Sequence, residues 1–155
     1  MEAPRWLADE MLGRLARYLR FLGHDTEYVR GLSDAEIADR AALDGRRLLT
    51  RDQGLAARVT GAVLITSTSL QEQLRQVRAA APAASYSVRF DRCTVCNGEL
   101  VPWTRPEEPP WPEDVPRALR ADERSIFECR RCRHHYWEGS HTAHVRRDVE
   151  VWLAG

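Results

Sequence analysis

Two Cys-x-x-Cys pairs constrain the fold of this chain more than any other feature of its sequence. The first pair is Cys93 and Cys96, the second is Cys129 and Cys132, and the chain has no other cysteine. Zinc prefers four thiolates in a tetrahedron, and each Cys-x-x-Cys turn supplies two of them. Four protein ligands leave no open position on the ion, so we expect a structural zinc rather than a catalytic one. The interval between the pairs exceeds the usual spacing, which predicts a projecting loop.

Two disulfides, or a single redox-active pair, are the alternative explanations of the four cysteines. The N-terminal residues lack the apolar stretch of a signal peptide, and no apolar run is long enough to span a membrane. We therefore expect a cytoplasmic protein, a compartment that disfavours structural disulfides. A redox motif would need only one pair. Residues 89–155 also contain few aliphatic side chains, so metal binding is expected to drive the folding of this segment.

Residues 1–80 alternate short apolar runs with helical patterns. The expected strands cover residues 5–8, 26–29, 47–50 and 62–66, and the expected helices cover 12–22, 33–45, a short stretch around Leu55, and 69–77. Alternating strands and helices indicate a parallel sheet. The alanine-rich stretch 79–85 is expected to be a linker. The predicted fold class is therefore α/β: a domain over 1–80 with a mostly parallel sheet, followed over 89–155 by a small β-rich zinc ribbon with a C-terminal extension.

Three aspartates follow or flank the expected strands. Asp9 ends the first strand, Asp52 ends the third, and Asp34 begins the helix before the third strand. In an open parallel sheet, ligands bind beyond the carboxyl ends of strands, where the strand order reverses. We expect the three acids to converge there and to hold Mg²⁺ or Mn²⁺, which prefer oxygen ligands. Each acid also has a structural explanation, because Asp34 and Asp52 both suit the N-terminus of a helix.

Three arginines near these acids are candidates for binding substrate. Arg14 and Arg17 lie opposite the leucine stripe of the first expected helix, and Arg51 precedes Asp52. The alternative for each is a solvated helix face or loop. Net charge is zero, and all 23 basic residues are arginine, so any electrostatic attraction to nucleic acid must come from local clusters.

The motifs also resemble a known family. The segments 9–20 and 22–25 resemble the opening of the PIN-like ribonuclease family named from the C-terminal domain of the mutator-seven exonuclease. Residues 49–52 (Leu-Thr-Arg-Asp) resemble a signature of PIN-type nucleases, and the second cysteine pair with residues 136–141 resembles the zinc-ribbon ending of that family.

The resemblance covers nearly the whole chain and implies a PIN-like three-layer domain that cleaves RNA. Asp9 and Asp52 match acidic metal-binding positions of PIN domains, and Asp34 matches a third, with Glu36 as its competitor. Residues 66–68 (Thr-Ser-Thr) stand where PIN domains often place another aspartate. The number of metal ions in the site, one or two, therefore stays open.

The leading hypothesis is a metal-dependent endoribonuclease acting on single-stranded RNA. The alternatives are a non-catalytic RNA-binding module and a protein-interaction adaptor. Four histidines follow or flank the second cysteine pair, and with four cysteines present we expect them to be structural or to contact RNA: His134, His135, His141 and His144.

Overall fold

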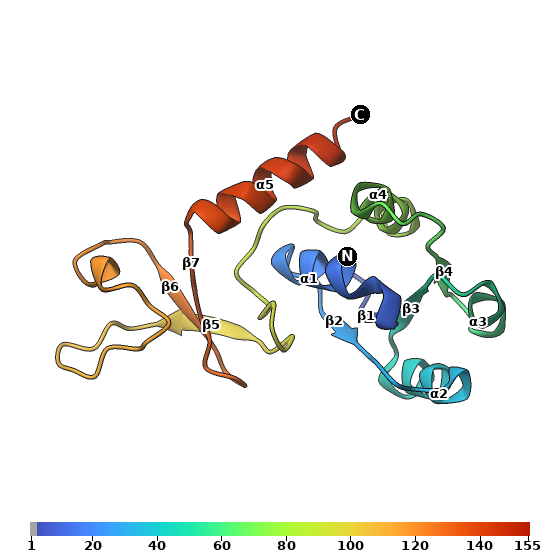
Figure 1. Cartoon of the computed structure of the whole chain (residues 1–155), viewed down its shortest axis with the longest axis horizontal. Coiled ribbons are helices and arrows are strands. Elements are labelled where there is room, and N and C mark those ends of the chain that lie inside the picture. The colour runs from blue at the N-terminus through green and yellow to red at the C-terminus, as the bar shows by residue number, and fades with distance from the viewer. Residues whose placement is uncertain (1–2) are drawn as a thin grey trace.

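The computed structural model describes residues 3–155 and contains two separate sheets (Figure 1). The first is a parallel sheet of four strands in the order β2-β1-β3-β4. Its strands are β1 (Trp6–Ala8), β2 (Thr26–Tyr28), β3 (Arg47–Thr50) and β4 (Val63–Leu64). The second is an antiparallel sheet in the order β5-β6-β7, made of β5 (Leu100–Trp103), β6 (Ile126–Cys129) and β7 (His135–Trp137). The two sheets match the predicted fold class.

Helices connect the parallel strands, and both ends of α2 (Asp34–Asp44) show how local residues begin and end such a helix. The helices are η1 (Glu10–Leu12), α1 (Gly13–Phe21), α2 (Asp34–Asp44), α3 (Gln53–Arg58), α4 (Leu70–Ala80), η2 (Arg117–Arg120) and α5 (Ser140–Trp152). At the start of α2, the Ser33 hydroxyl accepts a hydrogen bond from the Glu36 amide, and the Glu36 carboxylate accepts one from the Ser33 amide. Gly45 ends α2 with a φ of 62°, a conformation that glycine adopts without steric cost.

Two apolar cores cover the two faces of the parallel sheet. Trp6, Ala8 and Leu49 face α1 and α4, whereas Leu7 and Leu48 face α2 and α3. This alternation follows from the strand geometry, in which successive side chains point to opposite faces. The result is the predicted three-layer arrangement of helices, sheet and helices.

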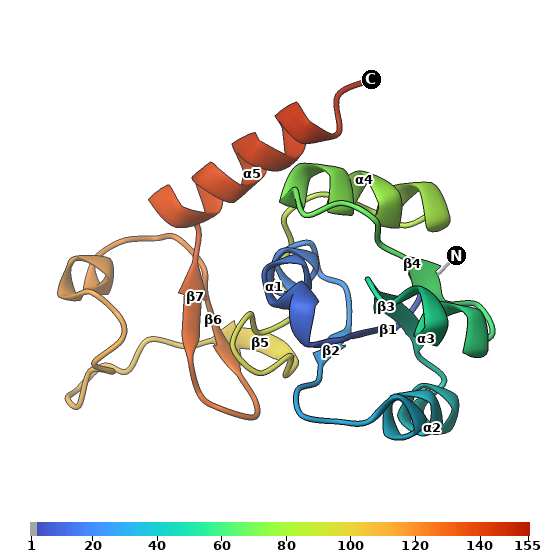
Figure 2. The ribbon, with the colours of Figure 1, turned by 45° about the vertical axis from the view of Figure 1, so that its right-hand side comes forward.

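The C-terminal helix returns to the first of these cores. After β7 the chain enters α5, which lies over α1 and α4 in both views (Figures 1 and 2). Val145 and Val149 are buried in the same cluster as Trp6 and Leu19. Trp152 stacks on Tyr18 with their ring centroids 5.3 Å apart. The last helix, although it follows the antiparallel sheet in sequence, is thus part of the parallel-sheet unit.

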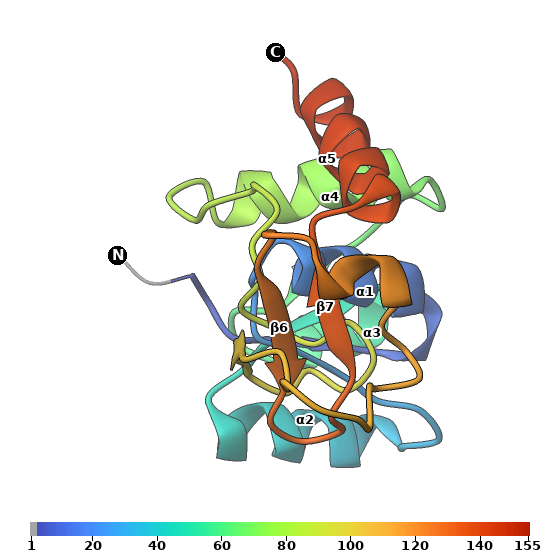
Figure 3. The ribbon, with the colours of Figure 1, turned by 90° about the vertical axis from the view of Figure 1, so that its left-hand side faces the viewer.

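The antiparallel sheet and its two Cys-x-x-Cys turns, called the ribbon below, lie against the outer side of α1 and β2 (Figure 3). The buried Arg20 of α1 donates hydrogen bonds to the carbonyl oxygens of Thr94 and Val95, in the first cysteine turn. The expected linker is also fixed, since α4 extends to Ala80 and a His24 ring nitrogen lies 2.7 Å from the Ser85 carbonyl oxygen. The ribbon is therefore held to the parallel-sheet unit by specific polar contacts.

The ribbon has a small apolar cluster of its own at the end away from the cysteines. Val115, Leu119 and Ile126 are buried there, and Trp103, Trp111 and Trp137 pack around them. Within residues 3–155, every helix is too short or too polar to cross a membrane.

Candidate functional site

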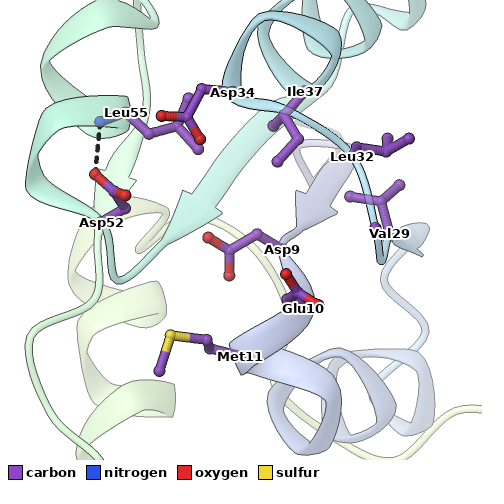
Figure 4. Close-up of a pocket in the computed structure, with 10 residues that line it drawn as sticks. Asp9, Glu10, Met11, Val29, Leu32, Asp34, Ile37, Asp52 and Leu55 are labelled. Atoms are coloured by element: carbon purple, nitrogen blue, oxygen red, sulfur yellow. Dashed lines mark hydrogen bonds between the residues drawn. The ribbon is translucent and has the colours of Figure 1, made fainter.

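A small acidic pocket opens at the carboxyl ends of β1 and β3 (Figure 4). The strand order reverses at this place, because β2 lies on one side of β1 and β3 on the other. The pocket has a volume of about 150 Å³, and four carboxylates line it: Asp9, Glu10, Asp34 and Asp52. The three predicted aspartates thus line one pocket, although they come from three different segments of the chain.

Asp9 is the buried member of this group, with 8% of its surface exposed. Its Oδ2 accepts a hydrogen bond from the Thr50 hydroxyl at the end of β3. Its Oδ1 is buried without a hydrogen-bond partner among residues 3–155. Burial raises the pKa of Asp9 above its ordinary value, and the negative charge of Asp52 adds to this, while the Thr50 hydrogen bond opposes it.

Asp52 is held by the helix that it begins. Its Oδ1 accepts a hydrogen bond of 2.9 Å from the Leu55 amide, so it caps α3 (Figure 4). Its own amide donates to the Thr50 hydroxyl at 3.0 Å. Thr50 therefore connects the two acidic residues, since its single hydroxyl donates to Asp9 and accepts from Asp52.

Asp34 reaches the pocket from the start of α2, whereas its competitor Glu36 does not. The Asp34 carboxylate is about half exposed and lies 4.0 Å from the Arg58 guanidinium of α3. The Glu36 carboxylate is instead used in the capping hydrogen bond to Ser33. Among the predicted alternatives for the third acid, Asp34 is the one that lines the acidic pocket.

The acidic pocket fits a hard cation bound partly through water. An uncompensated buried carboxylate oxygen is costly, and a cation at Asp9 Oδ1 would remove that cost. Within the described part of the chain, no three carboxylates bring their oxygens within 4.8 Å of one another. Mg²⁺ usually keeps several of its waters and is held by one or two carboxylates. The oxygen donors of this pocket could therefore hold Mg²⁺ or Mn²⁺, with Asp9 as the candidate direct ligand.

The predicted substrate arginines lie away from this pocket. Arg14 and Arg17 project from α1 beside α5, and both line a hollow there with His141 and His144. Arg51 is partly buried, and its Nε has no hydrogen-bond partner within residues 3–155. The arginines of α1 thus face α5, whereas Asp9 and Glu10, which precede this helix, line the acidic pocket.

The four cysteines form the second candidate site. Their sulfur atoms all lie within 4.8 Å of one another, and no disulfide joins them in the described residues. The Cys93 and Cys132 sulfur atoms are 3.6 Å apart, and those of Cys96 and Cys129 are 3.5 Å apart. Each pair thus contributes one sulfur to each of these contacts, which gives the compact four-sulfur arrangement that zinc requires.

The backbone around the sulfur atoms is shaped to enclose them. A Cβ atom on Gly98 would lie 2.6 Å from the Cys129 sulfur, so only glycine fits at this position. The residues that follow the two pairs, Asn97 and Arg133, both have a φ of 67°, which shows that the two turns have the same form. The cluster can therefore bind a metal such as zinc.

Sequence reasoning gave no role to two residues that organise these sites. Thr50 lies inside the Leu-Thr-Arg-Asp motif. Its place between an apolar strand and an aspartate is the sequence signal that could have indicated its role beside the acids. Asn97 follows the first cysteine pair, and its Oδ1 accepts a hydrogen bond of 2.9 Å from the Thr26 amide of β2. Nothing in the local sequence indicates that contact, because its partner is 71 residues away.

Comparison with curated proteins and with solved structures found no match to this chain. Comparison with family models matched residues 4–149 to the family described as the Mut7-C RNAse domain. The matched segment includes the acidic pocket, both cysteine pairs and most of α5. It agrees with the resemblance seen in the sequence motifs, and it indicates a ribonuclease-related function with RNA as the substrate. The chain belongs to the Mut7-C RNAse domain family.

Proposed function

We propose that this protein is a metal-dependent endoribonuclease that hydrolyses phosphodiester bonds of single-stranded RNA in the acidic pocket. The observation that carries the proposal is the buried Asp9, whose Oδ1 has no hydrogen-bond partner within residues 3–155 although three more carboxylates line the same pocket. Family membership supplies the RNase class. The charge and the unsatisfied oxygen together favour a cation at this site.

Asp9 would bind Mg²⁺ or Mn²⁺ directly, and Asp34 and Asp52 would bind it directly or through its waters. Such an ion activates water and neutralises charge on the phosphate. The Thr50 hydroxyl donates a hydrogen bond to Asp9 Oδ2 and so fixes the orientation of this carboxylate. The N-cap hydrogen bond to the Leu55 amide fixes Asp52 on the rigid start of α3. These contacts fix the orientation of both acids before substrate arrives, which lowers the entropic cost of reaching the transition state.

The four cysteines would hold one structural Zn²⁺ in this proposal. Zinc bound by four thiolates has no free position for substrate, so its contribution is to fold the ribbon. The catalytic and structural metals are thus expected to be chemically different and separately removable.

The test is cleavage of end-labelled single-stranded RNA by zinc-loaded protein, with Mg²⁺, with Mn²⁺, and with neither ion. Asp52→Asn is the informative variant, because asparagine still caps α3 and leaves the fold intact. Asp39→Asn, on the exposed side of α2, is the matched control. We expect ion-dependent cleavage that falls about 100-fold or more in Asp52→Asn and is unchanged in Asp39→Asn.

Equal cleavage by wild type and Asp52→Asn would refute this site. Folded, zinc-loaded protein that binds RNA and never cleaves it would instead support an RNA-binding module. Protein that neither binds nor cleaves RNA would support an adaptor.

A further inference from the structure

A second pocket lies between α1, the first cysteine turn and the start of α5, apart from the acidic pocket. This cleft has a volume of about 360 Å³. A smaller hollow of about 140 Å³ adjoins it and shares three lining residues with it: Arg17, Phe21 and His141. Figures 1 and 3 show the three elements side by side, with β7 leading into α5 across the end of α1. We call the two hollows together the interdomain groove.

The charge of the interdomain groove is opposite to that of the acidic pocket. Arg14 and Arg17 line it from α1, and His141 and His144 line it from α5. No aspartate or glutamate is among its lining residues in the described part of the chain, and the nearby Asp148 is already bonded to Tyr18 and His144. The first turn of α5 also borders the groove, and the positive end of its helix dipole adds to the same field. The groove is therefore suited to an anion.

The walls of the groove are aromatic and apolar as well as basic. Phe21, Tyr136 and Trp137 line it, and the Arg17 guanidinium lies over the Phe21 ring, 5.8 Å from its centroid. Val95, in the first cysteine turn, stands at the groove with 64% of its surface exposed. Basic side chains interleaved with flat apolar surfaces are the features that bind unstacked bases and their phosphates.

We propose that the interdomain groove binds single-stranded RNA, with Arg14 and Arg17 contacting phosphate and Val95 and the aromatic walls contacting bases. Arg14 lies in the first turn of α1, shortly after Asp9, Glu10 and Met11, which line the acidic pocket. A strand in the groove is therefore led toward the acidic pocket along a single helix. The inference rests on the proposed function for its substrate, and it assigns the ribbon a second role, as one wall of the RNA site.

The test measures binding separately from cleavage. A 5′-labelled single-stranded RNA of mixed sequence is titrated by fluorescence anisotropy against full-length, zinc-loaded Asp52→Asn protein, at several salt concentrations. Arg17→Gln is added to this background and compared with Arg40→Gln, which changes an exposed arginine of α2 outside the groove. We expect Arg17→Gln to weaken binding about tenfold and to lower the salt slope by about 0.7, as for one lost phosphate contact. Arg40→Gln should change neither.

A second variant tests the base-contacting wall without removing an arginine. Val95→Asp places a carboxylate in the groove at an exposed position, so the fold tolerates it. Val151→Asp is the matched control, because Val151 is 65% exposed and lies outside the groove. Only Val95→Asp should weaken RNA binding, because it replaces an apolar base contact with a charge that repels the neighbouring phosphates.

The outcomes separate this inference from the proposed function. If Arg17→Gln and Val95→Asp both weaken RNA binding, the groove is supported as an RNA-binding site even if the wild type never cleaves RNA. If the wild type cleaves RNA and neither variant changes RNA binding, the groove is not the RNA-binding site, while the proposed nuclease function stands. Failure to bind RNA, or capture of an acidic polyglutamate peptide in its place, also overturns the inference.

Discussion

The main-chain amide of Thr26 donates a hydrogen bond of 2.9 Å to Oδ1 of Asn97, which joins the edge of the parallel sheet to the first cysteine turn. Both residues are buried. The Asn97 side-chain nitrogen also donates to Asp25 Oδ1 at 2.7 Å, and Arg46 donates to the same oxygen at 2.7 Å. Burial alone would raise the pKa of Asp25, but these hydrogen bonds and the charges of Arg46 and Arg92 lower it below the ordinary value. The contact makes the ribbon and the sheet energetically dependent on each other.

Replacing Asn97 with glycine should lower the free energy of unfolding by about 2 kcal/mol, since two hydrogen bonds are lost and the Thr26 amide is left unsatisfied. Glycine keeps the left-handed backbone, so only the side-chain contacts are removed. Arg133→Gly, at the equivalent φ of 67° in the second turn, is the control and should have little effect, because its ion pair with Glu128 is exposed. Urea unfolding of both variants measures the difference, and equal losses would contradict the docking role of Asn97.

Removing the proposed zinc should destabilise the parallel sheet as well as the ribbon. Cys132→Ser deletes one exposed ligand and should abolish the expected content of one zinc per chain. Because Arg20 and Thr26 are bonded to the first cysteine turn and to Asn97 that follows it, amides of β1 and β3 should lose protection against hydrogen exchange. Metal analysis and hydrogen exchange by mass spectrometry check both points. Unchanged protection of β1 and β3 in zinc-free protein would show that the two sheets are independent.

Asp9→Asn should stabilise the protein in the absence of Mg²⁺ and Mn²⁺, by about 1 kcal/mol at neutral pH, because an ionised carboxylate with one unsatisfied oxygen is no longer buried. The folded-state pKa of Asp9 is raised, so the wild type loses stability as pH rises from the unfolded value of 3.8 through the folded pKa. The gain in free energy of unfolding from Asp9→Asn should therefore be absent at pH values below 3.8 and complete at pH values above the folded-state pKa. Urea unfolding of both proteins at acidic and neutral pH measures whether the difference between them grows as the pH rises.

We expect Mn²⁺ to stabilise the wild type and not Asp9→Asn, which thermal unfolding with increasing Mn²⁺ would measure. A variant that gains no stability without the ion, or that responds to Mn²⁺ as the wild type does, would exclude Asp9 as its ligand.

Thr50→Val should weaken Mn²⁺ binding about tenfold, because the hydroxyl that positions Asp9 and accepts the Asp52 amide is lost. Thr50→Ser keeps the hydroxyl and should bind the ion nearly as the wild type does. Isothermal titration with Mn²⁺ distinguishes the two variants. Equal affinities in both would mean that the hydroxyl does not position Asp9.

Much of the fold is predictable from the sequence because local chemistry determines it. The helix expected over 33–45 forms because Ser33 and Glu36 make a capping box at its start and Gly45 ends it. Asp9, Asp34 and Asp52 line one pocket because parallel strands bring their carboxyl ends to one edge. The ligand identity of the three acids stays a prediction, as does the division of the chain at residues 80 and 89.

Contacts between distant segments were not predictable. The leucine stripe of α1 shows which face is buried, yet it does not show that α5 covers the side bearing Arg14 and Arg17. Because α5 follows more than 120 residues later in the chain, the spacing of apolar residues within α1 does not indicate that contact. The docking of Asn97 on Thr26 is hidden for the same reason, since a short polar residue after a cysteine pair also suits the turn itself.

The return of α5 onto α1 also has a consequence for biosynthesis. Val145 and Val149 complete a core whose first members, Trp6 and Leu19, are translated more than 120 residues earlier. As the ribosome proceeds, the side of α1 that α5 covers stays open until the cysteine turns and the whole antiparallel sheet have been made. The acidic pocket precedes this event in sequence, but the sheet that carries it is shared with the core that α5 completes. We therefore expect this sheet to gain its last stabilising contacts only after the last helix has been translated.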